Sequence, residues 1–283
     1  MSPQPFTSWL NDPRRPPLVM GILNVTPDSF SDGGKFSEPD AAIRQAELMV
    51  ESGADLIDVG GESTRPGSQR VPADEQIRRV LPVVRAVVAR LDVVISIDTT
   101  RAEVASAALD AGASVVNDIS AGRDDPSMFK LVASRGVPIV LMHMLGHSPA
   151  TMQDNPAYPS NDVVSAVESF LKSRRDSAIA SGIASENVLF DPGIGFGKTA
   201  EHSLTLLRET RRLASLGQPL LVGASRKRFI GAITGETEPS DRLFGTAAAV
   251  AWSVANGAAI VRVHDVGAMA KVVRTVRAIQ GTP

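Results

Sequence analysis

The sequence contains no cysteine, few aromatic residues and no long apolar run, and each absence removes a class of protein. Without cysteine, the chain has no disulfide, no thiolate metal site and no thiol nucleophile. The most apolar window, residues 247–261, is shorter than the roughly 20 residues of a membrane helix and contains Ser253 and Asn256. Residues 1–17 contain no apolar signal core. We therefore expect a cytoplasmic protein that does not bind a membrane.

An excess of charge of one sign is also missing. The chain has 29 Lys and Arg residues against 31 Asp and Glu residues, which gives a formal net charge of −2. Aromatic residues make up only 4% of the sequence, and no basic patch is interleaved with aromatic side chains. Long-range attraction to a polyanion needs a basic surface. We therefore expect small-molecule substrates and no nucleic acid partner.

What the sequence does contain is a repeated unit, in which a short apolar run precedes a helical pattern of apolar residues. The apolar runs are residues 18–23, 56–59, 93–97, 114–116, 138–142, 188–190, 220–222 and 259–261. Residues 200–213 and 243–255 are two of the helical patterns. No change of composition follows residue 18, so we divide the chain into an N-terminal extension, residues 1–17, and one domain, residues 18–283.

Eight such units predict an α/β fold, a single (β/α)₈ TIM barrel, whose typical length is near ~250 residues. The alternative, a doubly wound open sheet, would need only about five or six strands. A polar loop of residues 24–38 follows the first predicted strand, and GGESTRPGSQRV follows the second. Long loops inside a compact domain are usually functional. We expect both loops to be mobile and to carry ligand-binding residues.

Polar residues stand at the end of almost every predicted strand, which is the end where TIM barrels build their active sites. These residues are Asn24, Asp58, Asp98, Asn117, His143, Asp191, Lys227, Arg262 and His264. Any one of them alone would be an ordinary turn or capping residue. Because the polar ends of eight strands converge on one opening, the set indicates a site.

The residue types at these strand ends suggest a ligand chemistry. Asp98, Asn117 and Asp191 offer carboxylates and an amide to a flat heterocycle with several N–H groups. Donors or positive charge for a phosphate or pyrophosphate come from Arg65, Lys227, Arg262 and His264. Asn24 is a neutral oxygen ligand of the kind that Mg²⁺ uses when substrate phosphates complete its shell. Residues 193–199 resemble no complete nucleotide-binding fingerprint, and the sequence has no HExxH zinc motif.

Eight motifs, taken in order, carry a resemblance to a known family. They are GILNVTPDSFSDGG from Gly21, IDVGGESTRPG from Ile57, SIDT from Ser96, VVNDIS from Val115, LMHM from Leu141, LFDPGIGFGK from Leu189, LVGASRKRF from Leu221 and VRVHDV from Val261. With these motifs the chain resembles bacterial dihydropteroate synthase, a pterin-binding family of folate biosynthesis, from Val19 to Ala278.

The resemblance implies a barrel that joins 6-hydroxymethyl-7,8-dihydropterin pyrophosphate to 4-aminobenzoate, forming 7,8-dihydropteroate and pyrophosphate. The implied ligands of the pterin pyrophosphate are Thr64, Asp98, Asn117, Asp191, Lys227, Arg262 and His264. The implied aminobenzoate pocket is formed by Phe30, Thr64, Pro66, Phe196 and Arg228. The implied catalytic residues are Asp32, Arg65, Lys227, Arg262 and His264, with Asn24 as the Mg²⁺ ligand.

Members of this family are usually homodimers through their late helices, which suits the Ala-rich residues 243–255. The resemblance also implies competition by sulfonamides for the aminobenzoate pocket. Two other functions fit a pterin-binding barrel. A methyltetrahydrofolate-dependent methyltransferase would share the Asp98, Asn117 and Asp191 pattern, and a non-catalytic pterin-binding paralog would lack loop or pyrophosphate residues that this chain has.

Overall fold

Eight parallel strands form one sheet in the computed structural model of the chain. The structure describes residues 1, 3–12, 14–26, 38–63, 68, 70–146, 157–158 and 162–281, and every structural statement below concerns these residues. The strands are β1 Leu18–Asn24, β2 Leu56–Gly60, β3 Val94–Asp98, β4 Val115–Asp118, β5 Ile139–Met142, β6 Val188–Asp191, β7 Leu221–Val222 and β8 Ile260–Val263.

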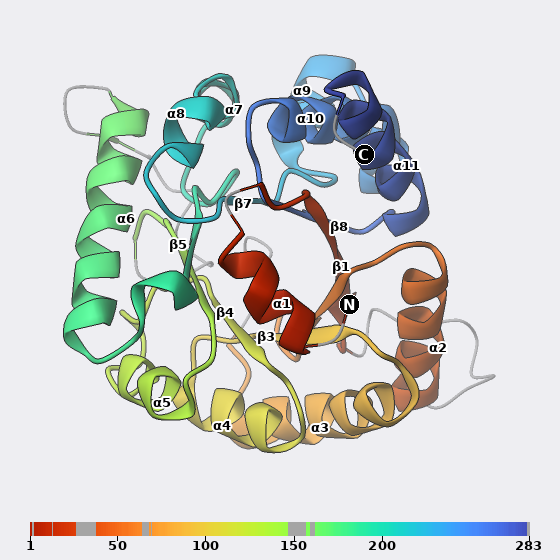
Figure 1. Ribbon diagram of the computed structural model, residues 1–283. Coiled ribbons are helices and arrows are strands. Elements are labelled where there is room, and N and C mark those ends of the chain that lie inside the picture. Colours follow the sequence, from red (N-terminus) through yellow and green to blue (C-terminus); the bar gives the residue numbers. More distant parts are fainter. Residues whose placement is uncertain are drawn as a thin grey trace.

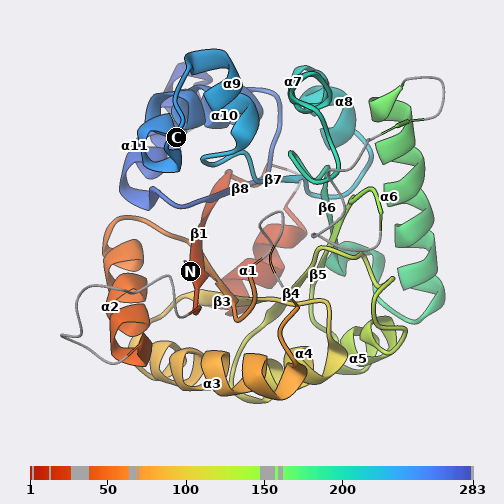
Figure 2. The same ribbon diagram turned by 180° about the vertical axis from the view of Figure 1, so that it is seen from behind.

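The sheet curls into a barrel. Its strand order is β6-β5-β4-β3-β2-β1-β8-β7, and each named pair is parallel. An isolated bridge between Phe190 and Leu220 joins β6 to the residue before β7, so the two edges of the sheet meet. Figures 1 and 2 show the strands around a common axis from its two ends. The prediction of a (β/α)₈ barrel is therefore confirmed.

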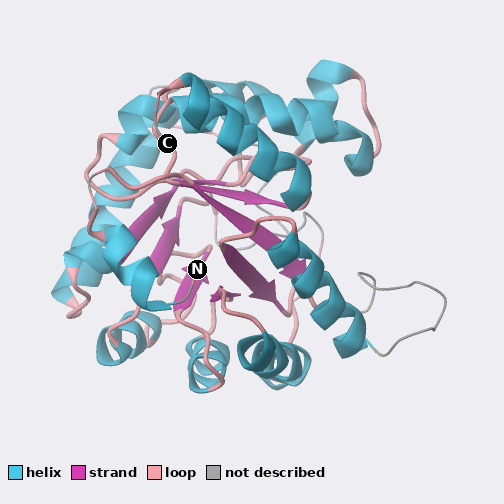
Figure 3. Cartoon of the chain, turned by 45° about the vertical axis from the view of Figure 1, so that its right-hand side comes forward, coloured by secondary structure: helices cyan, strands magenta, loops and turns pink. Residues whose placement is uncertain are grey.

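Helices cover the outside of the barrel, as the view in Figure 3 shows. They are α2 Glu38–Glu51, α3 Ala73–Arg90, α4 Ala102–Asp110, α5 Met128–Arg135, α6 Val163–Ala180, α7 Ala200–Arg208, α8 Thr210–Ala214, α9 Arg228–Thr234, α10 Leu243–Ala255 and α11 Val266–Ile279, with 3₁₀ turns η3 Ser185–Asn187 and η4 Pro239–Arg242. In α3, Val80, Val83, Val84 and Val87 are all fully buried. Their three- and four-residue spacing places them on the one face that meets the barrel.

The prediction of one helix over residues 200–213 is wrong. The structure has α7 and α8, separated at Glu209 (φ −89°, ψ 14°). The carbonyl of Leu207 accepts hydrogen bonds from the Thr210 hydroxyl and the Trp252 indole N–H, each at 2.7 Å. In a continuous helix, this carbonyl would accept the backbone N–H four residues further along the chain. Here the two side-chain donors bind it instead.

A helix that the sequence did not predict lies within the extension 1–17. Helix α1, Pro3–Leu10, crosses the opening at the N-terminal end of the barrel in Figure 1. Phe6, Trp9 and Leu10 are buried in one apolar cluster with strand residues that point into the barrel. The Phe6 and Trp9 rings stack with centroids 5.4 Å apart, and the Trp9 indole N–H donates to the Pro16 carbonyl at 2.7 Å. The barrel is closed at this end by apolar side chains.

Strand alternation builds a polar layer on top of this apolar layer. The apolar cluster contains Leu56, Val94, Val115, Leu189 and Ile260. Side chains two residues apart on a strand face the same side. Two positions further along the same strands stand Asp58, Ser96, Asn117, Asp191 and Arg262. Polar side chains therefore fill the barrel toward its C-terminal end. In the described part of the chain, no helix is long and apolar enough to cross a bilayer.

Candidate active site

Arg262 is at the centre of the polar layer. From β8 its Nε donates to Asp58 Oδ2 on β2 at 2.6 Å, and its Nη2 donates to Asp98 Oδ2 on β3 at 2.7 Å. Asp58 Oδ2 also accepts from Asn117 Nδ2 on β4 at 2.9 Å. Asp58, Asp98 and Asn117 are buried. Four side chains from four strands thus form one connected network at the C-terminal end of the barrel.

The network keeps unused acceptor oxygens. Asp58 Oδ1, Ser96 Oγ and Asn117 Oδ1 are buried and lack a hydrogen-bond partner in the described structure. Burial raises the pKa of the Asp98 carboxyl to about 7, an effect that Arg262 opposes and the nearby carboxylates reinforce. A buried polar atom without a partner costs free energy. The site is therefore suited to a ligand that brings its own donors.

Asp191, at the end of β6, is held by the turn that follows it. Its Oδ1 accepts the amide N–H of Gly193 at 2.7 Å. Gly193 has φ +66°, and a Cβ there would collide with the carbonyl oxygen of His143, so only glycine fits this turn. Burial raises the pKa of Asp191 to about 6, against the opposing charges of Lys227, Arg262 and Lys198.

Lys227 and Phe196 come together beside Asp191. The Lys227 ammonium lies 4.1 Å from the centroid of the Phe196 ring. Gly195, with φ +79°, lets the backbone approach the Lys227 stem, since a Cβ there would stand 3.3 Å from Lys227 Cδ. Burial lowers the pKa of Lys227 to about 8. The resemblance implied that Lys227 binds the pterin and Phe196 the aminobenzoate, and the structure brings these two side chains into contact.

His264, just after β8, is held in one orientation by Ser225. The Ser225 hydroxyl oxygen accepts the His264 backbone N–H at 3.2 Å and lies 3.1 Å from Nδ1. The hydroxyl hydrogen can then bond Nδ1, which leaves the N–H on Nε2. Burial lowers the pKa of His264 to about 3, and Arg226, Arg262 and Lys227 lower it further. At neutral pH the unliganded imidazole is a neutral donor.

A cavity of about 620 Å³ opens at this end of the barrel. Predicted site residues in its lining are Asn24, Phe196, Lys227, Arg228, Arg262 and His264. Asp98, Asn117 and Asp191 are outside the lining, but Arg262 joins it to the buried carboxylates. A Cβ at Gly60 would stand 3.6 Å from Asn24 Oδ1 and 3.5 Å from Asp98 Cβ, so both side chains flank Gly60. Six predicted site residues therefore line one opening, and three more, Asp98, Asn117 and Asp191, stand at the ends of β3, β4 and β6.

Five predicted site residues lie outside the described residues: Phe30, Asp32, Thr64, Arg65 and Pro66. The two long loops that contain them are described only near their ends, so the expected mobility also falls outside the described residues.

Two residues of the site had no role in the sequence-based prediction. Asp58 was recognised only as a polar strand residue, yet it holds both Arg262 and Asn117. Lys198 is buried, and its Nζ contacts His143 Nδ1 at 3.0 Å and donates to the Phe196 carbonyl at 3.0 Å. Burial lowers the pKa of Lys198 to about 7. The spacing of Asp58 two residues beyond Leu56 was the signal that could have identified it.

Known proteins resemble the chain in sequence and in structure. Residues 20–264 match the family described as pterin binding enzyme. The dihydropteroate synthase of Synechocystis is 48% identical over 277 residues, 98% of this chain and 95% of that protein. A structure of Xanthomonas albilineans dihydropteroate synthase with 4-aminobenzoic acid has a TM-score of 0.89 and 45% identity, covering 95% of this chain and 94% of that chain.

A structure of Yersinia pestis dihydropteroate synthase in a sulfonamide drug complex has a TM-score of 0.88 and 41% identity, covering 94% of this chain and 95% of that chain. The match to the family spans most of the chain, and the Synechocystis and Xanthomonas proteins cover it almost completely. The resemblance stated from the motifs is confirmed. The chain belongs to the pterin-binding enzyme family and, within it, to the dihydropteroate synthases.

Proposed function

We propose that this chain condenses 6-hydroxymethyl-7,8-dihydropterin pyrophosphate with 4-aminobenzoate, releasing pyrophosphate and 7,8-dihydropteroate. One observation carries the proposal. Buried acceptor oxygens without partners, Asp58 Oδ1 and Asn117 Oδ1, stand beside a cavity lined by cationic side chains. The N–H groups on the ring edge of a pterin would satisfy such acceptors, and the cations would bind a pyrophosphate.

The pterin would bind near the barrel axis, at the C-terminal ends of the strands. Asp98, Asn117 and Asp191 surround the barrel axis at the ends of β3, β4 and β6 and would accept ring N–H groups. Arg262 would hold Asp98 in place through its Nη2. A charge-assisted hydrogen bond is stronger than a neutral one, so the ionised carboxylates should provide most of the binding free energy.

The pyrophosphate would lie in the cationic part of the cavity. The described lining contains Lys227, Arg228, Arg262 and His264 and no Asp or Glu. As the bond between the exocyclic carbon and the pyrophosphate oxygen breaks, its electron pair leaves with the pyrophosphate. Donors already fixed around that oxygen stabilise the developing charge. Arg65 would add to this grip, and Asp32 would face the positive carbon.

Mg²⁺ would be held by Asn24. Among the described residues, no group of three His, Asp or Glu side chains is placed to hold a metal, and Asn24, which lines the cavity, is the ligand proposed from this part of the chain. Mg²⁺ accepts such a site when substrate phosphates and water complete its shell. When bound, it would supply positive charge to the pyrophosphate oxygens. We expect Asn24→Ala to raise the Mg²⁺ concentration needed for half-maximal activity while metal-free pterin binding is unchanged.

The aminobenzoate would bind last. Its amine nitrogen forms the new bond to the exocyclic carbon and then releases its proton to solvent, and an arylamine needs no strong base for this attack. Phe196 and Arg228, which line the cavity, would form the described part of its pocket. Phe30, Thr64 and Pro66 would supply the remainder. Because the pocket is completed by loops that grip the anion, 4-aminobenzoate should bind weakly to free enzyme and well once pterin, pyrophosphate and Mg²⁺ are present.

The enzyme would act as a homodimer through its late helices. Phe244 on α10 is 86% exposed and Ile279 on α11 is 80% exposed. In Figure 1 these two helices stand together with α9 on one side of the barrel. Exposed large apolar side chains on neighbouring elements mark interaction surfaces. The cytoplasmic location expected from the sequence stays a prediction.

A pyrophosphate-release assay tests the proposed function. Release should require both the pterin pyrophosphate and 4-aminobenzoate, and a sulfonamide should compete with 4-aminobenzoate. Methyl transfer from methyltetrahydrofolate to an added corrinoid protein, without pyrophosphate release, would support the methyltransferase instead. Pterin binding without either reaction would indicate a non-catalytic paralog.

A further inference from the structure

The loop between β6 and α7 is rich in glycine, and Phe196 lies within it. Gly193, Gly195 and Gly197 have φ angles of +66°, +79° and +61°. Glycine adopts such angles readily, but it also leaves the unbound backbone free to leave them. The Phe196 amide closes the first part of the loop by donating to the Gly193 carbonyl at 3.0 Å. The part that follows Phe196 depends on bonds from side chains.

Lys198 supplies the first of these bonds and ties the loop to the end of β5. Its Nζ donates to the Phe196 carbonyl at 3.0 Å and to the His143 carbonyl at 3.3 Å, and it lies 3.0 Å from His143 Nδ1. Burial lowers the pKa of His143 to about 2, so its ring is neutral and Nδ1 can accept. A protonated lysine has three N–H groups, and these three acceptors use all of them.

Tyr158 supplies the second bond. Its hydroxyl donates to the Gly197 carbonyl at 2.7 Å, and its ring lies beside the His143 ring with centroids 6.0 Å apart. Two consecutive carbonyls, those of Phe196 and Gly197, are therefore each bound by a buried side chain. The backbone that carries the Phe196 ring cannot rotate without breaking one of these bonds.

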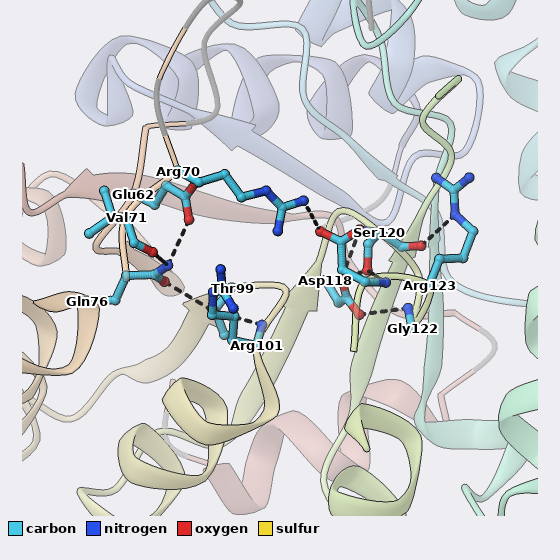
Figure 4. A network of polar contacts seen from close by, with 11 residues as sticks. Glu62, Arg70, Val71, Gln76, Thr99, Arg101, Asp118, Ser120, Gly122 and Arg123 are labelled. Atoms are coloured by element: carbon cyan, nitrogen blue, oxygen red, sulfur yellow. Dashed lines mark hydrogen bonds and ion pairs between the residues drawn. The ribbon is translucent and has the colours of Figure 1, made fainter. Parts of the chain in front are cut away.

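His143, to which Lys198 is anchored, is itself held in place. Its ring meets the edge of the Phe170 ring with centroids 4.9 Å apart. The Arg123 guanidinium lies 4.9 Å from the centroid of that Phe170 ring and donates to the carbonyl of Met144, the residue after His143, at 2.9 Å. Figure 4 shows the other bond of Arg123, to the Ser120 carbonyl at 2.9 Å. Lys198 therefore joins the glycine-rich loop to a fixed point of the barrel.

We propose that Lys198 is a positioning residue, which keeps the Phe196 ring at the cavity through the loop carbonyl that it binds. Lys198 and Phe196 both line the cavity. This inference rests on the proposed function, in which Phe196 contacts aminobenzoate. Because the three N–H groups of Lys198 are taken by acceptors of the protein, Lys198 acts through Phe196 and not on a substrate.

A double-mutant cycle in the full-length enzyme tests this route. Methionine is also unbranched, so Lys198→Met removes the donor with little change of shape. We expect it to raise the KM for 4-aminobenzoate about tenfold, because a buried carbonyl loses its donor. Phe196→Leu should raise the same KM by removing the aromatic face.

The double variant decides between two outcomes. Without the ring, Lys198 has nothing to position, so the double variant should have the KM of Phe196→Leu alone. A KM that rises by the product of the two single effects overturns the inference. Lys198 also lowers the pKa of the nearby Asp191. If Lys198→Met raises the KM for the pterin pyrophosphate more than that for 4-aminobenzoate, Lys198 acts through Asp191 and the inference is overturned.

Tyr158→Phe tests the second carbonyl and keeps the ring contact. It should also raise the KM for 4-aminobenzoate, by about threefold for a neutral hydrogen bond. Thr210→Val is the matched control, because the buried Thr210 hydroxyl donates to the Leu207 carbonyl at the same distance of 2.7 Å. Neither Thr210 nor Leu207 lines the cavity. If both variants lower Tm and neither changes this KM, the bonds are merely structural and the inference is overturned.

Hydrogen exchange tests the positioning without substrate. In Lys198→Met, the Phe196 amide should exchange about tenfold faster than in the parent, because the loop opens more often. The amides of the buried residues Val83 and Val87 on α3 should keep their parent rates. An unchanged rate at Phe196 overturns the inference. A parent enzyme that releases no pyrophosphate refutes the proposed function, and the exchange rates then still decide whether Lys198 holds the loop.

Discussion

The guanidinium of Arg262 donates to the fully buried Asp58 carboxylate at 2.6 Å, across 204 positions of sequence. The contact joins the last strand of the barrel to the second. The same carboxylate oxygen accepts from Asn117, so one acidic side chain orients two residues that we assign to the pterin.

Asp58→Asn should therefore harm both stability and ligand binding. An amide cannot replace a charge opposite Arg262, and breaking a buried ion pair costs about 3–5 kcal/mol. Urea unfolding should show a loss in this range, and calorimetry should show weaker pterin binding. Asp265→Asn is a matched control, because Asp265 pairs with Arg226 at a partly exposed position, where the pair contributes less. Equal losses of stability in the two variants would contradict this prediction.

The pH dependence of pterin binding should report on Asp191. Burial raises the pKa of its carboxyl from 3.8 to about 6, and a pterin with ring N–H donors favours the carboxylate. Affinity should therefore fall as pH drops below about 6, with proton release on binding near that pH. Asp191→Asn should bind more weakly and lose this part of the pH dependence. A pH profile that is the same in both proteins would exclude Asp191 as a pterin ligand.

The same pKa shift has a consequence for the stability of the unliganded protein. Folded Asp191 holds its proton up to a higher pH than unfolded Asp191 does. The contribution of this group to the free energy of unfolding is therefore complete below about pH 3.8 and is lost as pH rises through about 6. Asp191→Asn should remove this contribution, so the difference in unfolding free energy between parent and variant should change over that pH window.

Helix α1 should stabilise the barrel although it is far from the site. Phe6→Ala or Trp9→Ala would remove an aromatic side chain from the apolar layer, at a cost of about 3–5 kcal/mol. Thermal unfolding should show a lower Tm for both variants, with KM values unchanged where the protein is folded. Thr7→Ala, at an exposed position of the same helix, is the control. A Tm equal to the parent's in Phe6→Ala would show that α1 does not seal the barrel.

Phe244→Glu should separate the proposed dimer. Phe244 is 86% exposed, and in the dimer the glutamate carboxylate at this position would be buried without a partner. The cost of burying that charge disfavours association. Sedimentation should show a dimer for the parent and a monomer for the variant, both folded by circular dichroism. Ile179→Glu is the matched control, since Ile179 is 40% exposed on α6, which lies across the barrel from the late helices in Figure 1. A monomeric parent, or dissociation by Ile179→Glu alone, would contradict the proposed interface.

Local sequence patterns determined much of the architecture. The eight apolar runs overlap the eight strands, and the predicted helix at residues 243–255 agrees with α10. Such elements depend on residues only a few positions apart, because the side chains on one face repeat with the period of a strand or of a helix. The sequence also identified the polar residues at the strand ends. Their convergence followed from the predicted fold, because parallel strands in a barrel bring their C-terminal ends to one opening.

Only the tertiary structure decided how those residues act on one another. At the break between α7 and α8, the Leu207 carbonyl accepts from the indole N–H of Trp252, which lies 45 positions further along the chain. The role of Asp58 depends on Arg262, and the seal formed by α1 depends on side chains from across the barrel. Lys198 reads as one more polar loop residue until the chain folds His143 against it. Contacts of this kind join residues that no local period relates, so they exist only once the barrel has closed.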